Sequence, residues 1–236
     1  DFESNNAGND ASGNRNHLTL RGSAESTNGI KGKGLALDGF STLEPDDSGS
    51  TSTSSDFTWS IWFQTESEEA GALISNSGEG WQPGAKALFK GEGDFLGFDL
   101  GWVGAAEYEG SIQDGEWHHA VIVGSFPDDD PIGLFELYVD GNWVSEVEGE
   151  TEEVADPEER WFRVGGGSPG GFDPEEDGEE FPEPNTFFGS IDEVRIYDRA
   201  LEADEVTELL IDGLGELPAP SITNQPTSTQ GILGRS

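Results

Sequence analysis

The chain has 236 residues, enough to bury one substantial core, and its 49 acidic and 11 basic residues give a formal net charge of −38. This charge excludes nucleic acid as a partner, because phosphate backbones are bound through lysine and arginine. The chain has no cysteine to form a disulfide and no apolar run near the roughly 20 residues that span a bilayer, so we expect no membrane insertion. The acidity fits an environment rich in salt or divalent cations, and we expect a halophilic or marine protein.

The strand signals are short and are separated by Gly, Pro, Asp and Ser clusters, a pattern typical of β-sandwiches. Phe57–Phe63 alternates, which places its odd-numbered residues on one face. Trp117–Val123 predicts a further strand, with Val121 and Val123 on the face opposite to Ala120. These segments predict an all-β fold.

The second half of the chain adds a hairpin and a helix. Phe135–Val139 and Trp143–Val147 flank Asp140-Gly141, a strong hairpin signal because glycine accepts a positive φ. Phe187–Leu201 predicts a closing strand, and Asp204–Leu210 begins a helical pattern with its apolar residues on one face. We therefore expect one short C-terminal helix.

The closing segment Gly-x-Ile-Asp-Glu-Val-Arg-Ile-Tyr-x-Arg-Ala-Leu, at 189–201, resembles the C-terminal signature of laminin-G-like domains in the concanavalin A-like lectin/glucanase superfamily. Further segments follow in the order of that family: Asp10–Asn16, Gly32–Gly39, Phe57–Phe63, Asp114–Ala120 and Leu137–Gly141. The resemblance implies a two-sheet antiparallel jelly-roll sandwich that serves as a binding module.

The domain organisation follows from changes in composition. We predict the sandwich over residues 1–216, and over 217–236 either a Pro-rich flexible linker or a segment resembling the first strand of an immunoglobulin-like module. The chain begins at Asp1 without methionine, so we expect a processed protein or a piece of a larger multidomain protein. Ser41–Ser55 and the acid-rich Gly165–Pro184 are expected to be long surface loops, the first of them mobile.

Calcium is the expected cofactor, since the resemblance implies an ion that ties the N-terminal segment to the closing strand. Calcium prefers several oxygen ligands from carboxylates, carbonyls and amide side chains. The expected ligands are Asp192, the turn of Asp38 and Gly39, and Asp10, Ser12 or Asn14. The alternative is that the polar residues of 10–16 only hydrogen-bond their own turn.

Carbohydrate binding requires aromatic faces for sugar C–H groups and polar groups for the hydroxyls. Several aromatic residues stand in Gly-rich, loop-like contexts, close to acidic residues that could accept hydroxyls. The candidate ligand-binding residues are Trp81, Trp102, Tyr108, Phe172 and Asp99, with Asp94 and Glu107 as further acidic neighbours. The alternative for each aromatic residue is that it covers an edge of the core.

Catalytic patterns are missing from the predicted strands. The Glu-x-Asp-x-x-Glu spacing of β-glucanases that share this sandwich occurs only at 175–180, inside the acid-rich segment Gly165–Pro184 that is expected to be a loop, and no zinc or phosphate-binding motif occurs. His118 and His119 are adjacent on a predicted strand, so their rings point to opposite faces and cannot readily chelate one ion.

The sequence thus predicts a non-catalytic extracellular recognition module, secreted or at the cell surface, that contains calcium and binds a glycan. The alternative is a structural or adhesive module of a surface protein or filament that makes protein–protein contacts. A relative of glycoside hydrolases is the third and weakest interpretation.

Overall fold

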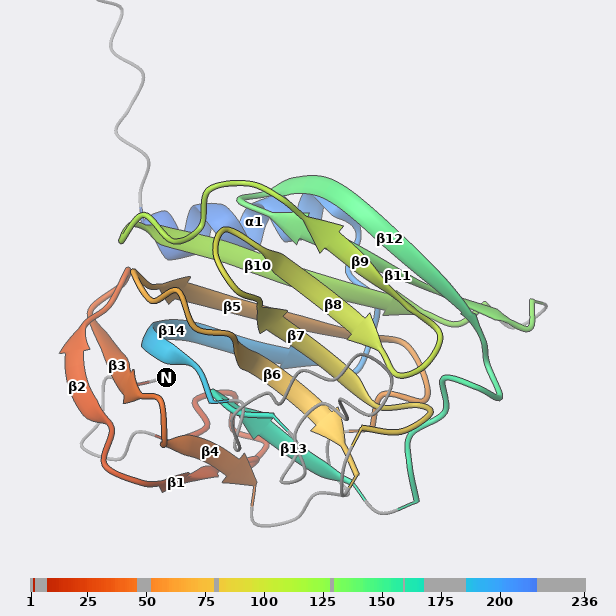
Figure 1. The fold of residues 1–236 in the computed structure, drawn as a ribbon, viewed down its shortest axis with the longest axis horizontal. Helices are drawn as coiled ribbons and strands as arrows, with labels where there is room; N and C mark the ends of the chain where they lie inside the picture. The colour runs from red at the N-terminus through yellow and green to blue at the C-terminus, as the bar shows by residue number, and fades with distance from the viewer. Residues whose placement is uncertain are drawn as a thin grey trace, which may run out of the picture.

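The computed structural model describes residue 2 and residues 8–45, 52–78, 81–127, 130–158, 160–167 and 186–215. These residues form two stacked seven-stranded antiparallel sheets and one helix (Figure 1). Sheet A has the strand order β1-β4-β13-β6-β7-β8-β9, and sheet B has the order β12-β11-β10-β5-β14-β3-β2. The predicted all-β sandwich with a C-terminal helix is confirmed.

The elements of sheet A are β1 (Leu18–Arg21), β4 (Thr42–Pro45), β6 (Gly71–Ser77), β7 (Lys86–Lys90), β8 (Leu96–Leu100), β9 (Gly104–Tyr108) and β13 (Trp161–Val164). The elements of sheet B are β2 (Glu25–Asn28), β3 (Lys33–Asp38), β5 (Phe57–Gln64), β10 (Trp117–Ser125), β11 (Ile132–Val139), β12 (Asn142–Glu150) and β14 (Phe188–Tyr197). Helix α1 spans Ala203–Leu214.

The main core lies between the two sheets, and β5 at the centre of sheet B contributes most to it. The odd-numbered residues Phe57, Trp59, Ile61 and Phe63 are each at most 1% exposed and all belong to this core, as their alternation predicts. Burial of one such side chain stabilises a fold by about 1.5–3 kcal/mol. The hydrophobic effect therefore determines which face of β5 points into the core.

Helix α1 covers the outer face of sheet B. Val121 and Val123 of β10 face away from the main core, as predicted, and pack with Leu201 and Val206 in a second apolar cluster. A methyl group at Gly213 would come within 2.2 Å of the indole nitrogen of Trp62, so glycine lets the helix approach the sheet closely. The outer face of sheet A lies on the opposite side of the sandwich from α1.

Two connections test the loop predictions. Asp140 and Gly141 have φ of 49° and 76°, which confirms the tight hairpin turn between β11 and β12. The expected mobile loop over 41–55 is wrong at its start, because Thr42–Pro45 form β4 and Leu43 is fully buried. Residues 52–55 form no strand, and of these only Thr53 is buried, while 46–51 lie outside the described residues. Thr42–Pro45 is too short and too polar for its sequence to predict a strand, although this strand buries Leu43.

Several predictions fall outside the described residues. The acid-rich segment 168–185, with Phe172, and the boundary between residues 1–216 and 217–236 lie there and stay predictions. Within the described ranges, no helix has the length and apolar character needed to cross a membrane.

Candidate functional site

One row of side chains crosses the outer face of sheet A. The strand registers align Arg163, Ser75, Ala87, Asp99 and Ala105 from β13 to β9. The even-numbered residues of β8 belong to the core, so Asp99 points outward from the sheet. The first three residues of the row are buried, whereas Asp99 is half-buried and Ala105 is exposed. The accessible part of this row is therefore its β8–β9 end.

Trp102 occupies the turn between β8 and β9 in an unusual conformation. The Val103 N–H donates to the Leu100 carbonyl at 2.8 Å, and Trp102, the third residue of this turn, has a φ of 66°. That position normally takes glycine, because positive φ brings a side chain too close to its own backbone. The side chain is also 67% exposed, so burial does not compensate for the strain. Such strained and exposed residues concentrate at functional sites.

Trp81 lies beside Trp102, although the two are separated along the chain by β7 and β8. The indole N–H of Trp102 donates to the main-chain carbonyl of Trp81 at 3.4 Å. The loop before β7 approaches closely here, since a methyl group at Gly101 would come within 2.2 Å of the Gln82 carbonyl. Two of the predicted sugar-binding aromatics are thus brought together at one end of sheet A.

Two carboxylates lie on the outer face of β8 and β9, the two strands that the Trp102 turn connects. Glu107 on β9 pairs with Gly97 and is a diagonal neighbour of Asp99, and the two side chains face the same side of the sheet. Burial and the nearby Glu107 raise the pKa of Asp99 to about 6. No described residue donates a hydrogen bond to the Asp99 carboxylate, which is available to an external donor.

Phe89 adds a third aromatic ring, which the sequence patterns do not single out. It pairs with Gly97 on the outer face of sheet A, and its ring lies so close that a methyl group at Gly97 would meet it at 2.9 Å. Gly97 therefore permits Phe89 to lie across the sheet toward Glu107. The signal in the sequence is the Phe89 to Gly97 spacing, but it has meaning only once the β7–β8 register is known.

Tyr108 is not part of this group. It pairs with Leu96 at the far end of β8 and β9, and its ring packs against the main core and over Gly110. Phe172, the remaining predicted ligand-binding residue, lies outside the described residues. The structure therefore brings Trp81 and Trp102 of the predicted set together at one end of sheet A, and places Asp99, Glu107 and Phe89 along the adjoining outer face.

Two of the predicted calcium ligands lie at different points along β14, Asp192 near its middle and Asp38 opposite its first residue. Asp192 is 1% exposed, and its carboxylate accepts the N–H groups of Lys31 and Glu193 at 3.1 and 2.8 Å. Asp38 lies opposite Phe188, four residues and about 13 Å along the strand from Asp192. The carbonyl of Gly39 accepts the hydroxyl of Thr186. The carboxylate of Asp192 and the carbonyl of Gly39 therefore do not face one ion.

The N-terminal part of the predicted calcium site forms a closed turn. The Asp10 carboxylate accepts the N–H groups of Ser12 and Asn16 at 2.7 and 2.9 Å, and the Ser12 hydroxyl accepts the N–H of Asn14 at 3.2 Å. This is the arrangement of the alternative interpretation, in which these residues hydrogen-bond their own turn. Among the described residues, no group of three or more His, Asp or Glu side chains is arranged to hold a metal ion. The predicted ligands therefore do not converge on one ion in the described residues, and calcium stays a prediction.

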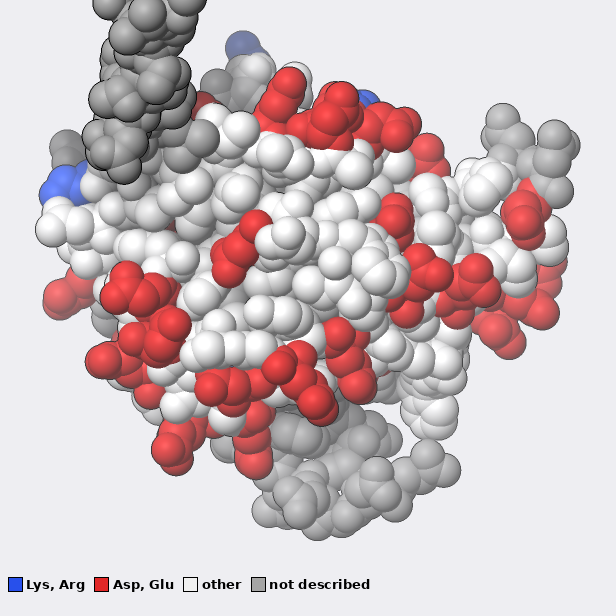
Figure 2. All heavy atoms as spheres, turned by 90° about the horizontal axis from the view of Figure 1, so that it is seen from above, with Lys and Arg blue, Asp and Glu red and all other residues white. Residues whose placement is uncertain are grey.

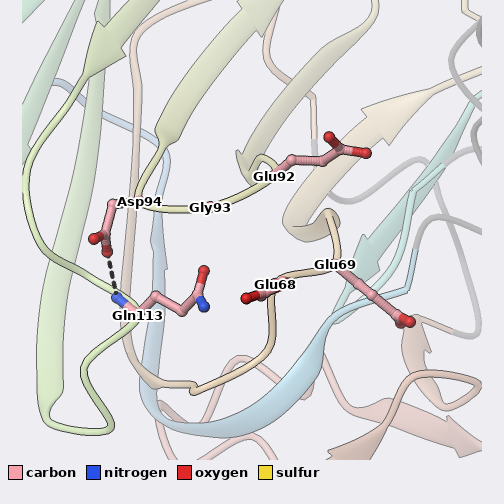
Figure 3. Close-up of a pocket in the computed structure, with 6 residues that line it drawn as sticks. All are labelled: Glu68, Glu69, Glu92, Gly93, Asp94 and Gln113. Atoms are coloured by element: carbon pink, nitrogen blue, oxygen red, sulfur yellow. Dashed lines mark hydrogen bonds between the residues drawn. The ribbon is translucent and has the colours of Figure 1, made fainter.

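An open hollow of about 520 Å³ lies at the opposite end of sheet A, between the turns that follow β5, β7 and β9 (Figure 3). It is lined by Glu68, Glu69, Glu92, Gly93, Asp94 and Gln113. Asp94 accepts the N–H groups of Ile112 and Gln113, each at 3.0 Å, and this joins two of the turns. Figure 3 shows the carboxylates of Glu69 and Glu92 directed apart, so the acidic groups do not converge on one point.

Lys90 explains why these acidic turns stay together. Its side chain is fully buried beneath the hollow and donates to the Glu69 carbonyl and the Gln113 side chain at 3.2 and 3.3 Å. Burial lowers the pKa of Lys90, and the surrounding carboxylates oppose this change. The sequence shows the acidic turns but not that one buried lysine connects them.

The two adjacent histidines have separate packing roles. His118 lies between the carboxylates of Asp140 and Asp114, at 2.9 and 3.2 Å. The ring of His119 points to the other face and stacks on Trp62 with ring centroids 5.0 Å apart. The prediction that the rings face opposite sides is confirmed.

Comparison with solved structures shows what this fold is similar to. Domain 4 of AbnA, an extracellular arabinanase from Geobacillus stearothermophilus solved in complex with arabinotriose, matches with a TM-score of 0.62 and 21% identity over 89% of this chain and 95% of that domain. The CBM40 of the Ruminococcus gnavus IT-sialidase, bound to α2,3-sialyllactose, matches with a TM-score of 0.56 and 14% identity over 75% of this chain and 96% of that one.

A third similar structure is the botulinum neurotoxin serotype C1 binding domain, with a TM-score of 0.59 and 11% identity over 86% of this chain. The alignment spans only 48% of that binding domain. No curated protein sequence matches the chain significantly. The family model described as concanavalin A-like lectin/glucanases superfamily, Laminin_G_3, matches residues 38–207. The chain therefore belongs to the concanavalin A-like lectin/glucanase superfamily, as the sequence motifs predicted.

Proposed function

We propose that this chain is a non-catalytic carbohydrate-binding module that acts outside the cell and binds glycan at the β8–β9 end of sheet A. The observation that carries the proposal is Trp102, an exposed tryptophan held at positive φ in a turn where glycine would be less strained. Its ring offers an apolar face to a sugar, and Asp99 and Glu107 offer acceptors for hydroxyl groups.

The similar structures support this proposal by analogy. Two of them are carbohydrate-complexed domains of the arabinanase and the sialidase, and the arabinanase is described as extracellular. The chain aligns with 95% of one domain of the arabinanase, which supports a role as one domain of a larger secreted or cell-surface protein. Because fold alone does not determine function, the site residues must carry the test.

The experiment is isothermal titration calorimetry with neutral oligosaccharides, arabinotriose included, on the wild-type chain and two tryptophan variants. We expect saturable binding that Trp102→Ala removes and that Trp143→Ala leaves unchanged. Trp143 is the matched control because it is an exposed tryptophan, 51% accessible, on β12. Binding that survives Trp102→Ala, or no binding to any oligosaccharide, contradicts the proposal.

An adhesive module is the alternative, and one surface feature favours it. Phe40 and Phe188 are 77% and 54% exposed, and both lie beside Gly39. Exposed neighbouring aromatics are a feature of protein contact surfaces. Self-association that Phe40→Ser and Phe188→Ser abolish, together with no response to sugars, would favour the adhesive function.

Glycoside hydrolysis is a second candidate because Asp99 and Glu107 form a carboxylate pair in which one pKa is raised. A hydrolase needs its two carboxylates on opposite sides of a bound sugar. Here they are diagonal neighbours on one sheet face, with the exposed Gly104 and Ala105 beside them. We expect no release of reducing sugar from any oligosaccharide that binds, and release that Asp99→Asn and Glu107→Gln abolish would reverse this assignment.

A further inference from the structure

The basic side chains of the described residues are mostly engaged with acidic ones. The ion pairs are Arg21 and Arg163 with Glu44, Lys31 and Arg195 with Asp212, Lys86 and Arg160 with Asp156, and Arg199 with Glu205. An acidic sugar is normally recognised by arginine or lysine groups that can turn to its carboxylate or sulfate. Few of the described basic groups are placed to do so.

The β8–β9 site has an acidic lining. The outward neighbours of Asp99 along the row are Ala87 and Ala105, and the nearest charged group is Glu107. Arg163, in the same row, donates to Glu44 at 2.8 Å and to the Gly167 carbonyl at 3.1 Å. The guanidinium of Arg163 is therefore held at the β13 end of the row, away from Asp99.

The net charge of the chain strengthens this local bias. Figure 2 shows one face on which acidic side chains are spread widely, while basic ones are visible only at its margin. The net charge of −38 repels an anionic ligand at long range, and Asp99 and Glu107 repel it at contact. Sugar hydroxyls, in contrast, donate hydrogen bonds that carboxylates accept strongly.

We propose that the β8–β9 site selects uncharged glycans, whose hydroxyls donate to Asp99 and Glu107, and excludes glycans that carry carboxylate or sulfate. This inference rests on the proposed carbohydrate-binding function and narrows it to one class of ligand. The chain would thereby differ in ligand charge from the sialidase CBM40, which was solved with a sialylated sugar.

The test presents neutral oligosaccharides beside counterparts that differ by one charged group: lactose with sialyllactose, and arabinotriose with its monosulfated form. Binding to the full chain is measured at about 0.15 M and 1 M sodium chloride. At 1 M the screening length falls to about 3 Å, so only contact repulsion remains. We expect a neutral sugar to bind at least tenfold more tightly than its charged counterpart, and this preference to persist at 1 M salt.

The double variant Asp99→Asn/Glu107→Gln is the matched test of the local cause. It keeps side-chain size and an acceptor oxygen at both positions, and its urea midpoint shows whether it is folded. We expect the tenfold preference to fall to about twofold or less. Equal or tighter binding of the charged sugars overturns the inference while the proposed function stands, and so does a preference that the double variant retains. Binding to no member of the set overturns both.

Discussion

The indole N–H of Trp102 lies 3.4 Å from the main-chain carbonyl of Trp81 and donates a hydrogen bond to it. This bond restricts the ring of an exposed side chain that would otherwise sample several rotamers. A ring ordered before binding loses less conformational entropy when it contacts a ligand. The hydrogen bond to Trp81 therefore preorganises the ring of Trp102 at the end of sheet A.

The first prediction is that Trp102→Gly leaves the fold as stable as the wild type or stabilises it, by up to about 1 kcal/mol. Glycine relieves the positive φ of 66°, and the exposed indole contributes little burial. Sugar binding is expected to be lost in the same variant. Urea unfolding and calorimetry measure the two effects separately.

Trp102→Ala is the matched control for this change. Alanine removes the ring but keeps a Cβ at positive φ, so it should lose binding without the stability gain. If Trp102→Gly destabilises the fold by more than about 1 kcal/mol, the ring is a structural element and the functional interpretation of its strain fails.

The second prediction concerns Asp99→Asn and the pH dependence of stability. Burial raises the pKa of Asp99 to about 6 in the folded state, above the value of 3.8 in the unfolded chain. The contribution of this group to stability is therefore fully present below pH 3.8 and is lost as the pH rises through 6. We expect the asparagine variant to be more stable than the wild type at pH 7 and nearly equal to it at pH 3.5. Urea unfolding at the two pH values measures this, and an equal difference at both would contradict it.

The sequence predicted the fold where each strand follows a simple alternation. In β5 the odd residues all belong to the main core, whereas Trp62 on the opposite face packs beneath helix α1. The alternation fails in β7, where Lys86 and Lys90 flank Leu88 on the inward face and are fully buried. Charged residues at inward positions conceal such a strand, since their partners come from distant loops.

The candidate site was only partly accessible to sequence reasoning. Composition identified Trp81, Trp102 and Asp99 as candidates, but only the β7–β8–β9 register shows that they are neighbours. Tyr108 looked equivalent in the sequence, and yet it pairs with the inward-facing Leu96 and packs on the core. A shift of one residue in register exchanges the two faces of a strand, so spacing alone cannot decide such cases.

The third prediction is that Lys86→Met destabilises the protein by roughly 3–5 kcal/mol. Lys86 is fully buried and donates to the Val154 carbonyl at 2.7 Å and to Asp156 at 3.3 Å. Its removal leaves the Asp156 carboxylate buried, with hydrogen bonds from the Thr53 hydroxyl and the Asn76 side chain but without its closest cation. Lys90→Met on the same strand is the control, and a smaller loss is expected because no buried carboxylate is left unpaired.

Lys86 also makes the free energy of unfolding depend on pH in alkaline solution. Burial lowers its pKa to about 8, although Asp156 opposes the shift, and the pKa in the unfolded chain is 10.5. Between these values the unfolded chain binds more protons, so the free energy of unfolding rises with pH. We expect an increase between pH 8 and 10 in the wild type that Lys86→Met reduces. Urea midpoints across that interval measure it, and identical slopes in the two proteins would contradict the assignment.

The fourth prediction separates general screening from specific calcium binding. Sodium chloride should raise the melting temperature gradually, because it screens the repulsion within a chain of net charge −38. This behaviour is what the expected halophilic character requires. Thermal unfolding at increasing salt concentration measures it, and a melting temperature unaffected by salt would contradict it.

Calcium is compared with sodium at equal ionic strength, with a chelator as the control. A further rise at micromolar calcium that the chelator removes would establish a specific site, since a ligand bound only to the native state stabilises it in proportion to the logarithm of its concentration. In the described residues Asp192 is held by two main-chain N–H groups and Asp10 by its own turn. We therefore expect Asp192→Asn to lower the melting temperature equally with and without calcium. A loss confined to the calcium-bound protein would instead place Asp192 in the ion site that the family resemblance implies.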